Sequence, residues 1–176
     1  MELKGIKALV VGAGKSGASA AGLLMKEGAR IVLYDSNRDL KEEEVRKKLP
    51  ADYNGDIVLG TLPDEVRDGA ELLILSPGVP TDLDYVNAVR ERGIPVWGEI
   101  ELACQFAHGK LAAVTGTNGK TTTTSLIGEI LKTFYSKVFV VGNIGSPYAD
   151  SVLDSTPDSV TVAEMSSFQL ETIDSF

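Results

Sequence analysis

Short apolar runs alternate with amphipathic segments over the first half of the chain. Residues 7–12 (KALVVG) and 30–35 (RIVLYD) form two apolar runs that predict buried strands, and residues 16–27 between them have the spacing of a helix that Gly28 can end. A strand, a glycine turn, a helix and a second strand within about 30 residues make a βαβ unit. We therefore expect two parallel strands joined by a right-handed crossover.

The same alternation continues beyond this unit. Further strands are predicted at residues 56–59, 72–76 and 95–97, and residues 82–92 have helical spacing. The charged stretch at residues 40–48 (LKEEEVRKK) predicts an exposed helix, to which we assign no function. Strands that alternate with helices are typical of α/β proteins, so the sequence predicts a Rossmann-like N-terminal domain built on a parallel sheet.

The pattern changes between residues 98 and 110, where we place a domain boundary. A short helix at residues 99–107 is followed by a fresh apolar strand at 111–115. The expected elements beyond it are a loop at 116–121, a helix to about residue 132, and strands at 137–141 and 159–163. We divide the chain into residues 1–98 and 99–176. About three strands and two helices are few for an independent α/β domain, so we expect the second unit to be the truncated start of a larger one.

Composition narrows the functional classes. The 176 residues are 43% hydrophobic and 24% charged, as in an ordinary globular protein, and the formal net charge of −8 argues against a nucleic-acid partner, since phosphate backbones recruit basic surfaces. The N-terminus resembles neither a signal peptide nor a membrane span. A lone Cys104 cannot form an internal disulfide, so we expect a cytoplasmic protein. We expect no membrane contact and no obligate protein partner.

Residues 12–17 (GAGKSG) match the spacing G-x-G-x-x-G between a predicted strand and a predicted helix. Glycines at these positions allow a tight turn and let the backbone approach a diphosphate at the start of the helix. Asp35, which ends the next strand, is placed to accept hydrogen bonds from a ribose or a base. The alternative is that the glycines only permit a close turn. NAD is the usual ligand of this motif, but a UDP-linked sugar presents the same diphosphate, and the glycines do not distinguish the two.

Residues 116–121 (GTNGKT) also lie between a predicted strand and a predicted helix, and this loop resembles a Walker A phosphate loop. It departs from the strict pattern at Val114, which takes the place of the first glycine. In such a loop the backbone N–H groups wrap the phosphates, Lys120 reaches the β- and γ-phosphate oxygens, and the Thr121 hydroxyl binds Mg²⁺. Glu164, after the next apolar run, is the expected second magnesium ligand. The alternative for the loop is a glycine-rich turn in which the lysine is coincidental. The alternative for Glu164 is an ordinary surface carboxylate.

Several motifs together resemble the Mur ligases, the ATP-dependent amide-forming enzymes of peptidoglycan synthesis. They are GAGKSG at 12–17, the turn Ser76-Pro77-Gly78, GTNGKTT at 116–122, GNIG at 142–145 and EMSSFQLE at 164–171. The central loop is shared with folylpolyglutamate synthetases. GAGKSG, the turn Ser76-Pro77-Gly78 and SSFQLE together resemble most closely the Mur ligase that joins D-glutamate to UDP-N-acetylmuramoyl-L-alanine. The resemblance runs from about Lys4 to the last residue and covers well under half of a typical member, so we expect an N-terminal fragment.

The resemblance implies a role for each motif. The first domain binds the UDP-linked substrate and the central domain binds ATP with Mg²⁺. The implied UDP-substrate residues are Gly14, Lys15, Ser16, Asp35, Ser36, Gly78, Asn143, Ser166 and Gln169. The implied ATP-binding residues are Gly116, Thr117, Asn118, Gly119, Lys120, Thr121 and Thr122. Thr121 and Glu164 would hold the metal, and Lys120, Thr121 and Glu164 would serve catalysis.

The resemblance also implies a reaction. The alanyl carboxylate attacks the γ-phosphate of ATP to give an acyl phosphate, and the amine of D-glutamate converts it to an amide. Family members use a histidine and a carbamylated lysine downstream of the SSFQLE motif, so we do not expect turnover by these 176 residues alone. Two alternatives are an NAD-dependent oxidoreductase, which would leave Lys120 and Thr121 unexplained, and a non-catalytic nucleotide-binding module.

Overall fold

The computed structural model describes residues 2–175 and contains two parallel β-sheets. The first sheet has the strand order β3-β2-β1-β4-β5. Its strands are β1 (Lys7–Val11), β2 (Arg30–Asp35), β3 (Asp56–Leu59), β4 (Leu72–Leu75) and β5 (Val96–Gly98). All four neighbouring pairs are parallel. The chain moves outward from β1 in one direction through β2 and β3, and in the other through β4 and β5. In an open α/β sheet the ligand crevice lies at this reversal, outside the carboxyl ends of β1 and β4.

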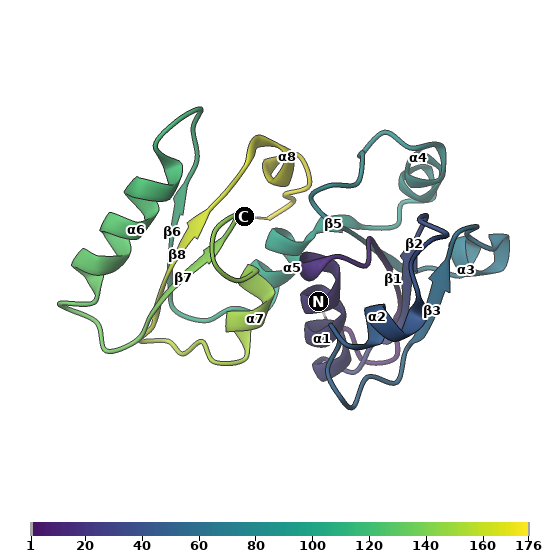
Figure 1. Cartoon of the computed structure of the whole chain (residues 1–176), viewed down its shortest axis with the longest axis horizontal. Helices are drawn as coiled ribbons and strands as arrows, with labels where there is room; N and C mark the ends of the chain where they lie inside the picture. Colours follow the sequence, from purple (N-terminus) through teal and green to yellow (C-terminus); the bar gives the residue numbers. More distant parts are fainter. Residues whose placement is uncertain (1, 176) are drawn as a thin grey trace.

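Helices cover both faces of the first sheet (Figure 1). Helix α1 (Lys15–Lys26) contacts β1, β2 and β4, and α2 (Glu42–Arg46) adds a buried valine to the same core. Helices α3 (Asp64–Asp68) and α4 (Asp84–Glu91) lie on the opposite face, away from the second unit. Alternate side chains of β1 enter the two cores. This burial on both faces explains why the strands are continuous apolar runs.

The second sheet has three parallel strands in the order β6-β8-β7. They are β6 (Lys110–Val114), β7 (Val138–Gly142) and β8 (Val160–Glu164). Helix α6 (Lys120–Leu131) contacts all three strands from the outer side of the molecule (Figure 1). Gly128 permits close packing, because a Cβ there would lie 2.5 Å from Cγ2 of Val140. The short helix α8 (Ser167–Leu170) follows β8.

Three helices join the two units. Helices α5 (Glu99–Phe106) and α7 (Tyr148–Val152) lie between the sheets, and both contact α1 of the first unit. One hydrophobic cluster runs through this layer from the first sheet to the second. The backbone N–H of Ala149 in α7 donates a hydrogen bond of 2.5 Å to the buried Glu99 carboxylate of α5. The units are therefore connected by a shared core as well as by the chain.

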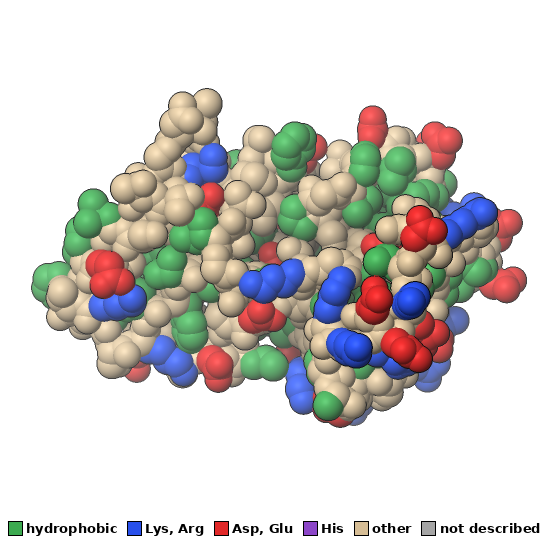
Figure 2. All heavy atoms as spheres, in the orientation of Figure 1, with side chains coloured by type: hydrophobic (Ala, Val, Ile, Leu, Met, Phe, Trp, Pro, Cys, Tyr) green, Lys and Arg blue, Asp and Glu red, His purple; other side chains and the backbone are tan. Residues whose placement is uncertain are grey.

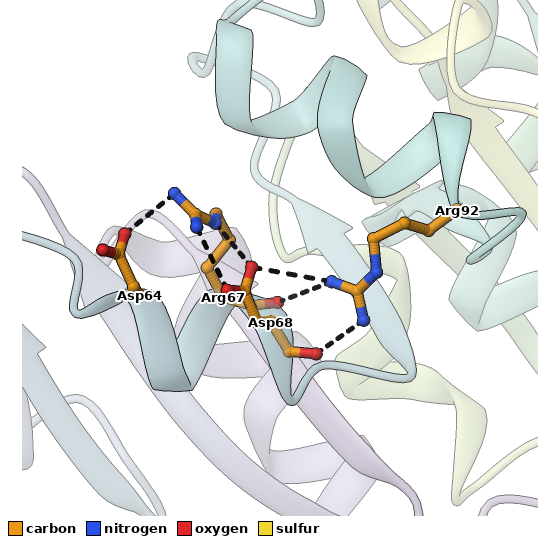
Figure 3. Close-up of polar contacts among 4 residues, drawn as sticks. All are labelled: Asp64, Arg67, Asp68 and Arg92. Carbon is orange, nitrogen blue, oxygen red and sulfur yellow. Dashed lines mark hydrogen bonds and ion pairs between the residues drawn. The ribbon is translucent and has the colours of Figure 1, made fainter.

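Charged contacts and apolar exposure are distributed unevenly over the surface. Arg67 contacts Asp64 and Asp68 within α3, and Arg92 at the end of α4 donates to the Asp68 carbonyl at 2.5 Å (Figure 3). These side chains are largely open to solvent, which screens the charges, so the pairs contribute little to stability. Apolar side chains instead gather over α6 (Figure 2). The large exposed ones in and just after this helix are Leu126, Ile130 and Phe134. Among residues 2–175, every helix falls short of the length and apolar character that crossing a membrane requires.

The observed elements follow the expected ones with specific differences. The strands agree to within one or two residues, and the charged helix predicted at 40–48 is present but shorter, with only Val45 buried. The second unit was expected to hold about two helices, which was wrong, because α7 and α8 accompany α5 and α6. Helix α3 of the first unit was not predicted either. These helices have four or five residues, too few to show a helical period.

Candidate functional site

The three glycines of the first loop have three different structural roles. Gly12 has a φ of +101°, and a Cβ there would lie 2.7 Å from Oγ of Ser76, so it makes the tight turn after β1. A Cβ at Gly17 would lie 1.8 Å from the carbonyl oxygen of Gly12, so Gly17 lets α1 pack against the loop. A Cβ at Gly14, the N-cap of α1, would meet nothing within 4 Å. The open position at a helix start is where a diphosphate can approach the backbone.

Asp35 holds this loop to the end of β2. Its Oδ2 accepts a hydrogen bond of 2.8 Å from the backbone N–H of Ala13, and its Oδ1 accepts one of 2.9 Å from Asn37. One carboxylate oxygen therefore holds the glycine loop, and the other holds the turn that follows β2. A ribose hydroxyl at Asp35 would share oxygens that already have backbone partners.

A cleft of about 710 Å³ opens between this loop, the segment after β4 and the second unit. Eight of the nine predicted UDP-substrate residues line it: Gly14, Lys15, Ser16, Asp35, Ser36, Gly78, Asn143 and Gln169. Ser166 is not among the residues lining this cleft. Its hydroxyl caps α8 by accepting from the Gln169 N–H at 3.3 Å, and the Gln169 side chain accepts from the Ser166 N–H at 3.0 Å. This capping box orders the start of α8.

A second cleft, of about 480 Å³, adjoins the first. Residues 76–80 and Gln169 line both, so the two form neighbouring compartments between the units. The second compartment is also lined by Phe168 and by the buried Glu99. Burial raises the pKa of the Glu99 carboxyl to about 7, and the nearby Asp150 adds to this, while hydrogen bonds from Ala149 and Tyr148 oppose it.

Three further residues that form the first cleft were not predicted as site residues from the sequence. The Ser76 hydroxyl donates to the carbonyl of Gly12 at 3.2 Å and ties the end of β4 to the glycine loop. Tyr34 and Tyr85 pack edge to face with centroids 6.4 Å apart and form an aromatic wall. Burial raises the pKa of Tyr85 to about 12. Tyr34 immediately precedes Asp35 and Ser76 immediately follows β4, so both stand at strand ends, where an α/β sheet binds its ligand.

The second glycine-rich loop lies between β6 and α6. Gly116 and Gly119 have φ values of +142° and +77°, which only glycine adopts readily, and Gly119 is the N-cap of α6. The ammonium of Lys120 donates to the carbonyl of Gly116 at 2.7 Å, so this side chain lies back across the loop. A cation above a turn at a helix start favours a bound anion.

Thr121 and Glu164 meet beside this loop. Glu164 is the last residue of β8 and pairs in register with Val114, the last residue of β6. Its Oε2 accepts a hydrogen bond of 2.8 Å from the Thr121 hydroxyl, and its Oε1 accepts one of 3.3 Å from the Asn143 amide. The carboxylate is 2% exposed.

The Thr121 hydroxyl and the Glu164 carboxylate are suitable ligands for a magnesium ion that is bound together with nucleotide phosphates. Hydroxyl and carboxylate oxygens are the ligands that Mg²⁺ prefers, and it commonly takes one or two from the protein while phosphates and waters supply the rest. Within residues 2–175 no group of three or more His, Cys, Asp or Glu side chains is arranged to hold a metal. A metal at Thr121 and Glu164 would therefore depend on the phosphates for its remaining ligands.

Asn143 connects the two halves of the site. It lines the first cleft, and its amide contacts Glu164 at the phosphate loop. Its backbone N–H also donates to the Glu164 carbonyl at 2.9 Å. A residue that lines the first cleft is thus fixed to the expected metal ligand.

Two family models match successive parts of the chain. The Mur ligase MurD-like N-terminal domain matches residues 6–98, and the Mur ligase middle domain matches residues 114–175. Two similar curated proteins are named UDP-N-acetylmuramoylalanine–D-glutamate ligase. The protein from Lachnoclostridium phytofermentans is 60% identical over 176 residues, and that from Lachnospira eligens is 49% identical over 176 residues. In both cases the match covers 100% of this chain and 39% of the relative.

Solved structures of peptide ligases share the fold. A murein peptide ligase from Psychrobacter arcticus matches with a TM-score of 0.52 and 17% identity, over 93% of this chain and 39% of that one. A pseudomurein peptide ligase type C from Methanothermus fervidus matches with a TM-score of 0.51 and 20% identity, over 92% and 33% of the two chains. At these identities the likeness concerns the fold alone, and it supports the predicted α/β class.

Proposed function

The chain belongs to the Mur ligase family, and we propose that it provides the UDP-substrate site and the ATP loop of a UDP-N-acetylmuramoylalanine–D-glutamate ligase. Residues 1–98 would form the UDP-substrate domain, and residues 99–176 would begin the ATP-binding domain. The chain spans 39% of the length of the curated relatives described above, so the reaction belongs to the longer protein. Because such an enzyme uses ATP and a nucleotide-linked precursor, we propose that the protein acts in the cytoplasm.

The first cleft would hold the UDP part of the substrate. The diphosphate would lie at the open Gly14 position, where Lys15 and Ser16 begin α1. The uridine would then extend toward Asp35 and Ser36. On the other side of the cleft the muramoyl-alanine part would reach Asn143 and Gln169. Ser166 would support this end through the α8 cap that it shares with Gln169.

The second loop would hold ATP. The residues assigned to it are Gly116, Thr117, Asn118, Gly119, Lys120, Thr121 and Thr122. Lys120 would exchange its contact with the Gly116 carbonyl for the β- and γ-phosphate oxygens. Thr121 and Glu164 would hold Mg²⁺, which neutralises phosphate charge when it is bound.

The proposed reaction joins a carboxylate to an amine in two steps. An oxygen of the alanyl carboxylate attacks the γ-phosphorus of ATP, so ADP leaves and an acyl phosphate forms. The amine of D-glutamate then attacks the acyl carbon, inorganic phosphate leaves, and an amide bond remains. The chain's own contribution is to position the carboxylate and to stabilise charge on the transferring phosphoryl group through Lys120.

The contact between Asn143 and Glu164 is the observation that carries this proposal. It fixes a residue of the UDP-substrate cleft to the carboxylate beside the ATP loop. A ligase needs this proximity, because the substrate carboxylate must reach the γ-phosphate. An NAD-dependent oxidoreductase would require only the first cleft and would leave the arrangement of Thr121 and Glu164 without a role.

Ligand-dependent melting of this chain tests the substrate assignment. UDP-N-acetylmuramoyl-L-alanine should raise the melting temperature, since a ligand at 100 times its Kd adds about 2.7 kcal/mol to the stability of the folded state. NADH at the same concentration should leave it unchanged. Stabilisation by NADH and not by the UDP compound would contradict the assignment and favour an oxidoreductase.

A further inference from the structure

Lys15 reaches from the first unit to the second. It is the first residue of α1, directly after Gly14, and it lines the UDP-substrate cleft. Its ammonium donates a hydrogen bond of 2.7 Å to the carbonyl of Gly145, which lies 130 residues further along the chain. One side chain therefore stands at the proposed diphosphate position while it holds a loop of the ATP-binding unit.

The loop that Lys15 contacts is fixed to the proposed metal site. This loop (residues 142–147) closes on itself through a hydrogen bond of 2.9 Å from the N–H of Gly142 to the carbonyl of Ser146. Asn143, two residues before the Lys15 contact, bonds to Glu164 through both its backbone and its side chain. A displacement of Gly145 would therefore also move Asn143 and change its hydrogen bonds to Glu164.

Neighbouring contacts hold the same junction without touching the diphosphate position. The hydroxyl of Ser19, one turn further along α1, donates to Asp150 in α7, and the N–H of Ala149 donates to Glu99. Lys15 differs from them, because it is also one of the residues that line the UDP-substrate cleft. An ammonium has three N–H donors, so it can keep its hydrogen bond to the Gly145 carbonyl and donate another to a phosphate oxygen.

We propose that Lys15 is a positioning residue that couples diphosphate occupancy of the glycine loop to the order of the 142–147 loop, and thereby to Asn143 and Glu164. The inference rests on the proposed function, since it takes the ligand to be a UDP-linked substrate. A bound diphosphate immobilises the Lys15 ammonium, and the immobilised ammonium restrains Gly145. Substrate binding thus orders the side of the ATP site that faces the substrate carboxylate. Coupling of this kind is a free energy shared between two sites through a physical contact.

Hydrogen exchange of the whole chain measures this coupling directly. Lys15→Met keeps the aliphatic stem and removes the charge, Lys15→Arg keeps the charge and the donors, and Lys26→Met is the matched control. Lys26 lies on the same helix but pairs with Asp52 of its own unit at 3.4 Å. Each variant is compared without ligand and with UDP-N-acetylmuramoyl-L-alanine at a concentration that saturates it.

In the free chain, Lys15→Met should speed exchange of the amides at 142–149 by about 3- to 10-fold, as expected for the loss of one hydrogen bond to a charged donor. Lys26→Met should leave these amides unchanged, and Lys15→Arg should restore protection. In the wild-type chain, the ligand should protect both the 12–17 loop and the 142–149 segment. In Lys15→Met it should protect the 12–17 loop alone.

The two claims fail in different ways. Equal exchange at 142–149 in wild-type and Lys15→Met without ligand would overturn the inference. So would equal ligand protection of 142–149 in both chains, and this result would leave the proposed substrate intact. A wild-type chain in which the ligand protects neither loop would contradict the proposed substrate and, with it, the coupling.

Discussion

The hydroxyl of Thr121 donates a hydrogen bond of 2.8 Å to Oε2 of Glu164, although the two residues are 43 positions apart. The contact arises because β6 and β8 are adjacent and parallel, so their carboxyl ends lie at the same edge of the sheet. Thr121 follows the loop after β6, and Glu164 ends β8. The two proposed magnesium ligands are thus in direct contact with each other.

Replacing Thr121 by valine should weaken magnesium-dependent ATP binding. Valine has the shape of threonine but lacks the hydroxyl oxygen that would reach the metal. We expect Thr121→Val to lower the affinity for Mg–ATP by about 10- to 100-fold, as for the loss of one interaction with a charged group. The effect should shrink when EDTA removes the metal. Isothermal titration calorimetry in magnesium and in EDTA measures both affinities.

Thr123→Val provides the matched control for this experiment. Thr123 is exposed on the same helix, so its replacement should leave Mg–ATP binding within about 2-fold of the wild type. If Thr121→Val and Thr123→Val bound Mg–ATP equally well, Thr121 would have no role at the metal.

Two variants of the glycine loop should separate its structural role from its binding role. Gly17→Ala should lower the free energy of unfolding by about 1–3 kcal/mol or more, because its Cβ would collide with the Gly12 carbonyl. Gly14→Ala meets no neighbour, so stability should change by less than about 1 kcal/mol, while binding of the UDP compound weakens. Urea unfolding and calorimetry separate the two quantities. Equal loss of stability in both variants would show that the loop does not have this geometry.

Glu99 should make stability depend on pH between about 4.5 and 7. Burial raises its pKa from an ordinary value of 4.5 to about 7, with a further contribution from Asp150. A carboxyl whose pKa is higher in the folded state stabilises that state fully below pH 4.5 and loses the contribution as the pH rises through 7. Relative to Glu99→Gln, the wild type should therefore lose on the order of 1–3 kcal/mol across this range.

Urea unfolding at a series of pH values checks this difference. Glutamine keeps an oxygen that can accept from the Ala149 N–H, so the variant isolates the charge. Titrating groups that do not interact with Glu99 contribute equally to both chains and cancel in the comparison. Parallel stability curves for wild type and variant between pH 4.5 and 7 would show that Glu99 titrates in the folded chain as it does in the unfolded one.

The positions of both glycine-rich loops were predictable because their signals are local. Glycine spacing and flanking apolar runs sufficed to place the loop at 12–17 and the loop at 116–121 between a strand and a helix. The α/β class and the Mur ligase family were also confirmed. The roles assigned to single residues of the site stay predictions, and so does the division of the chain at residue 98.

Relationships between distant residues could not be read from local pattern. Lys15 was expected to face a diphosphate, and its contact with Gly145 depends on how α1 meets a loop 130 residues away. Asp35 was expected to meet a ribose or a base, and the structure adds its hydrogen bond to Ala13. Ser166 was expected at the substrate, whereas its hydroxyl caps α8. Tertiary packing determines the first two relationships, and no spacing in the sequence encodes them. The cap differs, because Ser166 and Gln169 are three residues apart and S-x-x-Q is a local signature of a helix start that the prediction did not use.

The central claim is that the loop at 116–121 binds nucleotide phosphates through Lys120. Calorimetric titration of Mg–ATP into this chain tests it most directly. The wild-type chain should bind, and Lys120→Met should lower the affinity by about 10- to 100-fold. Lys132→Met, just beyond the other end of α6 and paired with Glu129, should bind as the wild type does. A wild-type chain that does not bind Mg–ATP, or a Lys120→Met chain that binds it as tightly as the wild type, would contradict the account.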